Sequence, residues 1–91
     1  MKFTLTKEIE LNGNMVSELE IDLDSLSVKD LSEAKTEWMR AGGFSPMPTL
    51  DMDFNMRCVA KALNVPFEDL QSMSGKDYMR LSQEVTGFFL K

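Results

Sequence analysis

Residues 3–23 read FTLTKEIELNGNMVSELEIDL and predict a β-hairpin. Apolar side chains occupy mainly odd positions on both sides of Asn12-Gly13-Asn14, with Thr, Glu and Asp mostly between them. An alternation of period two is typical of a strand with one buried face, and Asn-Gly is a strong hairpin signal. We expect the hairpin over residues 1–24. Because a lone hairpin is marginal in water, its apolar face must pack on other elements.

The length of the hairpin loop decides which side chains face each other. A two-residue loop, Asn12-Gly13, would set Leu5 opposite Glu20 and mix apolar and acidic side chains on both faces. A three-residue loop pairs odd positions with odd positions, and Asn14 would supply the left-handed residue that such a loop needs. We therefore predict the three-residue loop. Its pairs are Leu11/Met15, Lys7/Leu19, Leu5/Ile21 and Phe3/Leu23.

The predicted register places an acidic face on the solvent side of the hairpin. This face carries Glu8, Glu10, Glu18 and Glu20, with Glu8 directly opposite Glu18. Facing carboxylates mildly destabilise a strand pair. Two interpretations stay open: a face that protects the sheet edge and keeps the chain soluble, or an acidic patch for a partner with basic residues.

The residues after the hairpin predict helices. Ser27-Val28-Lys29-Asp30 has the form of a capping box, so we expect a helix over residues 27–41. The single Trp, Trp38, is expected to close the core against the hairpin because its ring offers the largest apolar contact. Residues 42–50 read GGFSPMPTL and predict a loop, since two glycines and two prolines disfavour a helix.

Residues 51–91 are expected to form the helical part of the chain. Apolar side chains recur at steps of three and four from Met52 to Leu63, and again from Tyr78 to Phe88. Pro66 separates these stripes and predicts a short helical turn. Strands followed by helices indicate an α+β fold in which three to four helices pack on one face of the hairpin. With 91 residues, we expect a single domain.

Composition excludes several functional classes. Fifteen acidic and ten basic residues give a net charge of −5, whereas phosphate binding needs clustered Lys and Arg, so we expect no nucleic-acid partner. No apolar run approaches the roughly 18 residues of a membrane span. Cys58 is interpreted as a small buried hydrophobe, and without histidine the chain has no zinc pattern. The sequence predicts no enzyme, no metal and no cofactor.

Apolar side chains that the predicted core does not require are candidates for partner contacts. Those of the loop, which include Phe44, either pin the loop to the core or contact a partner, and both alternatives stay open. Phe88 and Phe89 point about 100° apart on a helix, so one stripe cannot bury both. The candidates are Phe44, Met47, Leu50, Met73, Met79, Phe88, Phe89 and Leu90.

The order of these features resembles the phage tail assembly chaperone family, the E-type group of Mu-like and related contractile-tailed phages. The resemblance rests on an opening strand from FTL to EIEL, an Asn-Gly turn and a second strand that ends near Leu23. It continues with LSVKDL at 26–31, VAKALNVP at 59–66, and a last segment from Asp77-Tyr78 to Phe88-Phe89. Together these segments cover nearly the whole chain.

This resemblance implies a non-enzymatic protein of the bacterial host cytoplasm, made in an infected or lysogenic cell and absent from the mature virion. Its implied client is the tape measure protein, which bound chaperones keep soluble until tail-tube subunits polymerise around it. A longer frameshift product, common in the family, would make the tail-tube protein a second partner, and a homo-oligomer stays open. The alternative is an acidic phage-encoded inhibitor or adaptor that acts through the Glu-rich hairpin face.

Overall fold

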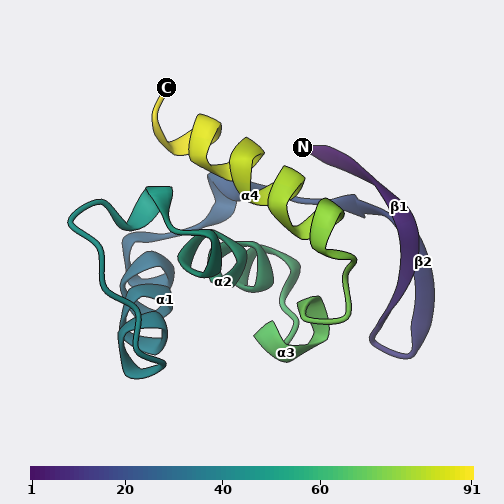
Figure 1. The fold of residues 1–91 in the computed structure, drawn as a ribbon, viewed down its shortest axis with the longest axis horizontal. Coiled ribbons are helices and arrows are strands. Elements are labelled where there is room, and N and C mark those ends of the chain that lie inside the picture. Colours follow the sequence, from purple (N-terminus) through teal and green to yellow (C-terminus); the bar gives the residue numbers. More distant parts are fainter.

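The computed structural model describes all residues, 1–91, and shows a β-hairpin followed by helices (Figure 1). The strands are β1 (Lys2–Leu11) and β2 (Asn14–Glu20). The helices are α1 (Val28–Arg40), α2 (Met52–Leu63), α3 (Phe67–Leu70) and α4 (Gly75–Phe89), and two short 3-10 turns are η1 (Leu23–Ser25) and η2 (Pro48–Leu50). This order confirms the predicted α+β fold class. The predicted loop over 42–50 therefore contains one helical turn, η2.

The core of the protein consists of two apolar clusters. The larger has 14 buried residues and lies between the hairpin and the helices α2, α3 and α4. The smaller consists of Ala34, Trp38, Phe54 and Cys58, and it joins α1 to α2. The prediction that Trp38 closes the core against the hairpin is therefore wrong. Its ring meets Phe54 edge-on at a centroid distance of 5.7 Å, because α1 packs on the side of α2 away from the hairpin (Figure 1).

The hairpin closes with a two-residue turn, so the predicted three-residue loop is wrong. Asn12 and Gly13 have φ angles of 52° and 83°. A type I′ turn needs two such left-handed residues, and its twist matches that of the strands. Asn14 instead begins β2, and Met15 is 61% exposed. None of the predicted pairs forms: Leu11/Met15, Lys7/Leu19, Leu5/Ile21 and Phe3/Leu23.

A bulge in β1 reconciles the two-residue turn with a buried apolar face. Beside the turn Ile9 pairs with Val16, and at the far end Phe3 pairs with Leu19. Between these regions β1 has four residues, 5–8, where β2 has one. The extra residues change the pairing from odd-with-even to odd-with-odd. Apolar side chains therefore face each other in both parts of the hairpin.

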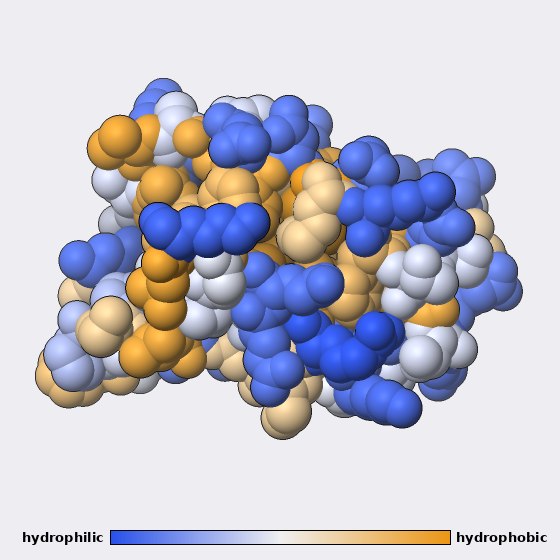
Figure 2. Space-filling view, turned by 90° about the horizontal axis from the view of Figure 1, so that it is seen from above, coloured by the Kyte–Doolittle hydropathy of each residue, from blue (hydrophilic) through white to orange (hydrophobic).

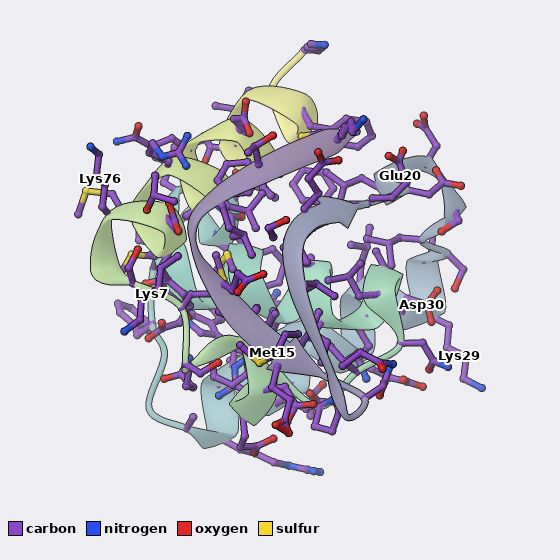
Figure 3. All side chains as sticks on the ribbon, turned by 90° about the vertical axis from the view of Figure 1, so that its right-hand side faces the viewer. Lys7, Met15, Glu20, Lys29, Asp30 and Lys76 are labelled. Atoms are coloured by element: carbon purple, nitrogen blue, oxygen red, sulfur yellow. The ribbon has the colours of Figure 1, made fainter.

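The acidic side chains of the hairpin lie on its solvent side but are not paired as predicted. Glu8 lies in the bulge, and the partner of Glu18 is Thr4, so the two carboxylates are not opposite each other. Lys2 Nζ lies 3.3 Å from a carboxylate oxygen of Glu18. Figure 3 shows the hairpin from this side, with Met15 near the tip and Glu20 near the other end.

The bulge is held by the carboxylate of Asp77, whose side chain is fully buried on α4. Oδ2 accepts hydrogen bonds from the main-chain N–H groups of Thr6 at 2.9 Å and Lys7 at 3.3 Å. Oδ1 accepts from the Thr6 hydroxyl at 3.0 Å and from the Arg80 guanidinium at 2.8 Å. Burial alone would raise the pKa of Asp77, but the hydrogen bonds from Arg80, Thr6 and Lys7 lower it to about 2.

Polar side chains begin the three longer helices. Ser27 and Asp30 form the predicted capping box at α1, and Asp51 caps α2. Ser74-Gly75-Lys76-Asp77 also has the sequence form of a capping box, but at α4 only half of this box forms. Ser74 accepts from the main-chain N–H of Asp77 at 3.2 Å, but the Asp77 carboxylate turns away to bind β1. Asp77, in the first turn of α4, thus positions the hairpin instead of completing the capping box.

Replacing Asp77 with Asn keeps the shape of the side chain but removes its charge. We expect Asp77→Asn to lower the free energy of unfolding by about 3 kcal/mol, because it leaves the Arg80 guanidinium without its charged partner. Urea unfolding at pH 7 measures this loss. Glu84→Gln, an exposed change on the same helix, is the matched control and should stay within about 0.5 kcal/mol of the parent protein.

The stability difference between the parent protein and Asp77→Asn should depend on pH. A lowered pKa means that the charged carboxylate stabilises the fold fully above its ordinary pKa of 3.8, and that this contribution is lost as pH falls through about 2. The difference in unfolding free energy between the parent and Asp77→Asn should therefore be constant above about pH 4 and shrink towards pH 2. A difference that is unchanged at pH 2 would contradict the role assigned to Asp77.

Candidate protein-interaction surface

The 42–50 loop is fixed to the fold at its start by Trp38. Gly43 lies directly against this ring, since a Cβ at Gly43 would stand 2.3 Å from its atoms. The main-chain N–H of Gly43 also donates to the Trp38 carbonyl at 2.9 Å. Trp38 Nε1 donates to Asp51 Oδ1 at 2.9 Å, and the same oxygen caps the first turn of α2. The two ends of the loop are thereby tied together.

A buried polar cluster fixes the end of the loop. The carbonyl of Thr49 accepts hydrogen bonds from Asn55 Nδ2 at 2.9 Å and from the Thr86 hydroxyl at 2.7 Å. Asn55 is fully buried, and its Oδ1 has no hydrogen-bond partner. An unpaired buried acceptor costs about 1–3 kcal/mol. The fold tolerates this cost at the residue that joins η2 to α2 and α4.

Between these anchors, the apolar side chains of the loop are exposed. Phe44 is 90% exposed, Leu50 57% and Met47 48%. The loop is pinned by Trp38 and Thr49 rather than by these three side chains. Of the two alternatives for the loop, the structure thus rules out the one in which its large apolar side chains hold it to the core. They are presented to solvent on a fixed main chain.

Met52 and Met79 extend this exposed apolar area along α2 and α4. They are 39% and 53% exposed and line one hollow of about 310 Å³ together with Tyr78 and Met73. Leu50 and Met52 flank the cap of α2, and Phe44 lines a neighbouring hollow with Asp51 and Asp53. We call these five side chains around the start of α2 the apolar rim. Its members are Phe44, Met47, Leu50, Met52 and Met79.

Met73 was predicted as a surface candidate, but it is not part of the apolar rim. It is only 8% exposed and belongs to the large core cluster, because the turn after α3 directs its side chain inward.

Tyr78, which lines the same hollow as Met73, is held by a hydrogen bond. Its hydroxyl donates to Asp53 Oδ1 at 2.9 Å. Burial and this hydrogen bond raise the pKa of Tyr78, so its hydroxyl stays protonated as a donor at neutral pH.

Phe88 and Phe89 are half-buried, and their rings meet edge-on at a centroid distance of 5.4 Å. Phe88 packs on the large cluster, whereas Phe89 contacts both clusters. Both rings therefore contact the core while part of each stays accessible, and a partner contact of Phe88 or Phe89 stays a prediction. Leu90, just past the helix, remains 54% exposed.

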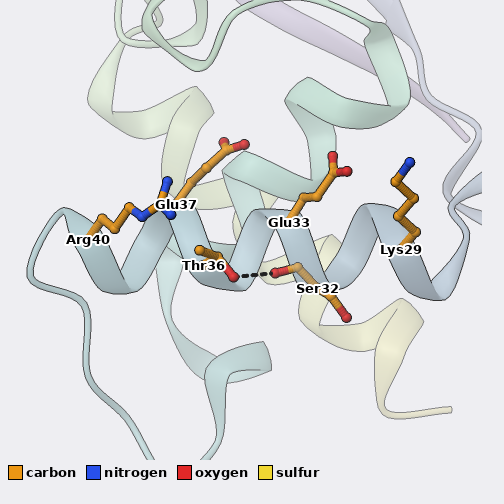
Figure 4. Close-up of a pocket in the computed structure, with 6 residues that line it drawn as sticks. All are labelled: Lys29, Ser32, Glu33, Thr36, Glu37 and Arg40. Carbon is orange, nitrogen blue, oxygen red and sulfur yellow. Dashed lines mark hydrogen bonds between the residues drawn. The ribbon is translucent and has the colours of Figure 1, made fainter.

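The outer face of α1 has a shallow polar hollow of about 350 Å³, drawn in Figure 4. Two of its carboxylates are already paired: Glu37 lies 2.8 Å and Glu33 3.3 Å from Lys61 Nζ on α2. The hydrogen bond to Glu37 contributes most to raising the pKa of Lys61. No apolar side chain lines this hollow, so it differs in chemistry from the apolar rim.

Figure 2 shows the surface above α4 coloured by hydropathy. Large orange areas lie at the left-hand end, where Figure 1 places the 42–50 loop and the C-terminus, while blue side chains dominate the opposite end. On this face, the exposed apolar side chains thus lie mainly away from the hairpin end. The hairpin carries the acidic candidates Glu8, Glu10, Glu18 and Glu20, all of them exposed.

Reactive groups are few. Cys58 is fully buried as predicted, and burial raises the pKa of its thiol to about 12, so it is neutral at physiological pH. The structure contains no group of three Cys, Asp or Glu side chains that could hold a metal ion. None of the helices combines the length and apolar content required to cross a membrane.

Sequence reasoning assigned Met52 to the core stripe of α2 and missed its exposure. A signal was present, because Met52 directly follows Asp51, a good helix cap, and first-turn residues often lie at the edge of a core. The contact between Gly43 and Trp38 had no local signal. It joins a helix to a loop, and nothing in the spacing of the two residues indicates that the ring folds back over the glycine.

The contact between Gly43 and Trp38 can be tested by adding one methyl group. We expect Gly43→Ala to lower the free energy of unfolding by about 2 kcal/mol, because the ring must move to admit a Cβ. Fluorescence from this only Trp should shift to the red as the ring gains contact with water. Gly87→Ala is the control: its Cβ meets open space within α4, and it should raise stability by about 0.5–1 kcal/mol.

An unchanged fluorescence maximum and stability in Gly43→Ala would show that the loop start is not fixed against Trp38.

Comparison with protein families gives one result, and it covers almost the whole chain. The sequence model of the family described as "Phage tail assembly chaperone proteins, E, or 41 or 14" matches residues 2–90. Comparisons with curated proteins and with solved structures returned no match. The matched region includes the hairpin, all four helices and the apolar rim. The chain belongs to the phage tail assembly chaperone family.

Proposed function

We propose that this protein binds the phage tape measure protein and keeps it soluble until tail-tube subunits polymerise around it. Membership of a tail assembly chaperone family supports a tail protein as the partner. The tape measure protein is the long helical component of a tail, and its apolar surface needs cover before the tube forms. The proposed role is non-enzymatic, since the protein acts by covering a surface.

The observation that carries this proposal is a fixed loop with exposed apolar side chains. Phe44 is 90% exposed although both ends of its loop are held by buried groups. Large exposed apolar areas on soluble proteins mark interaction sites. A main chain that is already ordered loses little conformational entropy on binding, so more of the contact energy appears as affinity.

The chemistry of the apolar rim suits a client with irregular helical stripes. Three of its five members are methionines, whose flexible, polarisable side chains adapt to apolar surfaces of different shape. One chaperone can then cover successive stretches of a long helical protein whose sequences differ. The net charge of −5 would keep loaded complexes apart by mutual repulsion.

We place the protein in the cytoplasm of the bacterial host during tail assembly and expect it to be absent from the mature virion. If a longer frameshift product is made, its additional segment would recruit the tail-tube protein to the same client. Proteomics of infected cells and purified particles can check each of these points.

The direct test removes the loop part of the apolar rim. We expect the triple variant Phe44→Ser, Met47→Ser, Leu50→Ser to bind a tape measure segment at least about tenfold more weakly, because each lost apolar contact costs about 1 kcal/mol or more. The dissociation constant in titration calorimetry and the soluble fraction of the co-expressed segment measure the effect. Added salt should change the parent affinity little, since the contact is apolar.

A matched control removes exposed apolar side chains elsewhere. Val28 and Met39 on α1 are 81% and 55% exposed and lie outside the apolar rim. The variant Val28→Ser, Met39→Ser should bind the segment as the parent does. Equal losses in both variants, or no loss in the triple variant, would reject the apolar rim as the client surface.

A further inference from the structure

The two edges of the hairpin are treated differently by the fold. The outer edge of β1 is closed by α4: Arg80 donates to the Thr4 carbonyl at 3.0 Å, and Asp77 accepts from the amides of Thr6 and Lys7. These bonds occupy main-chain groups that a neighbouring strand would otherwise use. Around residues 4–7, this edge is therefore occupied and not open to a further strand.

The outer edge of β2 has no such protection. Met1 and Ile21 exchange two hydrogen bonds of 2.7 Å, which makes them a hydrogen-bonded pair. By the alternation of an antiparallel ladder, the next residues along β2, Glu20 and Glu18, direct their main-chain N–H and C=O groups away from β1. No other element donates to or accepts from these groups. β2 therefore offers a free strand edge.

The side chains along this edge define what can pair with it. Glu18 and Glu20 lie on the same solvent face, with 51% and 78% of their side chains exposed. On the β1 side cations already approach both, Lys2 at 3.3 Å from Glu18 and the N-terminal ammonium at 3.7 Å from Glu20. On the open side of β2, no cation approaches either carboxylate. A third strand with basic side chains on this face would place positive charges beside Glu18 and Glu20 there.

We propose that the outer edge of β2 binds an extended segment of another protein that carries Lys or Arg at alternate positions, which joins the hairpin as a third strand. The main-chain groups of Glu18 and Glu20 supply the hydrogen bonds, and their carboxylates select the basic side chains. A second copy of this chain is disfavoured as the occupant, because pairing β2 with itself sets glutamates against glutamates. This surface lies apart from the apolar rim and is independent of the client proposed for it.

The probe is a fluorescein-labelled seven-residue peptide with Lys at its second, fourth and sixth positions and Thr or Val between them. At low salt we expect saturable binding in fluorescence anisotropy. The variant Glu18→Lys, Glu20→Lys should weaken it at least about tenfold, since two attractions become two repulsions. The control variant Glu68→Lys, Glu84→Lys changes the net charge equally, at two exposed carboxylates without ion pairs, and should stay within about twofold of the parent.

Two further measurements separate strand addition from simple charge attraction. A peptide with the same charges but methylated main-chain amides at its Lys residues should lose binding at least about tenfold, because it cannot donate to the strand edge. Hydrogen exchange of the Glu18 and Glu20 amides should slow on binding of the unmethylated peptide, while those of Leu19 and Ile21, already bonded to β1, stay unchanged.

The proposal is overturned if the methylated peptide binds equally well, if both charge-reversal variants lose binding equally, if exchange at Glu18 and Glu20 is unaffected, or if no peptide binds. The serine variant of Phe44, Met47 and Leu50 should bind the peptide as the parent does. Failure of this strand edge and failure of the apolar rim as the client surface are therefore distinguishable.

Discussion

The carboxylate of Asp77 lies between α4 and β1 with no exposed surface, and the placement of the hairpin depends on its four hydrogen bonds. In water this group would be solvated, so its burial is stable only while Arg80 and the bulge of β1 supply donors. The bulge in turn corrects the register that the Asn12-Gly13 turn imposes. One polar contact therefore joins the two parts of an α+β chain whose apolar core is small.

A second set of polar contacts serves the surface rather than the core. Trp38 and Asn55 lie on different helices, and each fixes one end of a loop whose own large side chains are exposed. A loop that merely connected α1 to α2 would not need two buried anchors. Holding the main chain still while leaving Phe44 in solvent is the arrangement expected of a binding surface formed before its partner arrives. The family membership gives that surface its biological setting.

Local signals in the sequence predicted the fold class and the start of α1, because the Ser27 cap acts on a residue only three positions away. The register of the hairpin was not predictable in this way, since Asp77 stands 71 residues from the amide of Thr6 that it binds. Its position in a capping pattern even suggested a different role. On the candidate surface, the exposure of Phe44, Met47, Leu50 and Met79 follows from their lying outside the apolar stripes. The burial of Met73 depends on the turn after α3, which no short pattern specifies, whereas Met52 lies in the first turn of α2, directly after its cap Asp51, at the edge of the core.

The claim that the fixed loop is the client surface is tested most directly by site-specific photocrosslinking. A photoreactive phenylalanine analogue would replace Phe44 in one protein and Val28 in another; the two side chains are 90% and 81% exposed on different parts of the molecule. With each protein co-expressed with the tape measure protein and irradiated, we predict a crosslinked product from position 44 and none from position 28. Equal crosslinking from both positions, or a product from position 28 alone, would contradict the account.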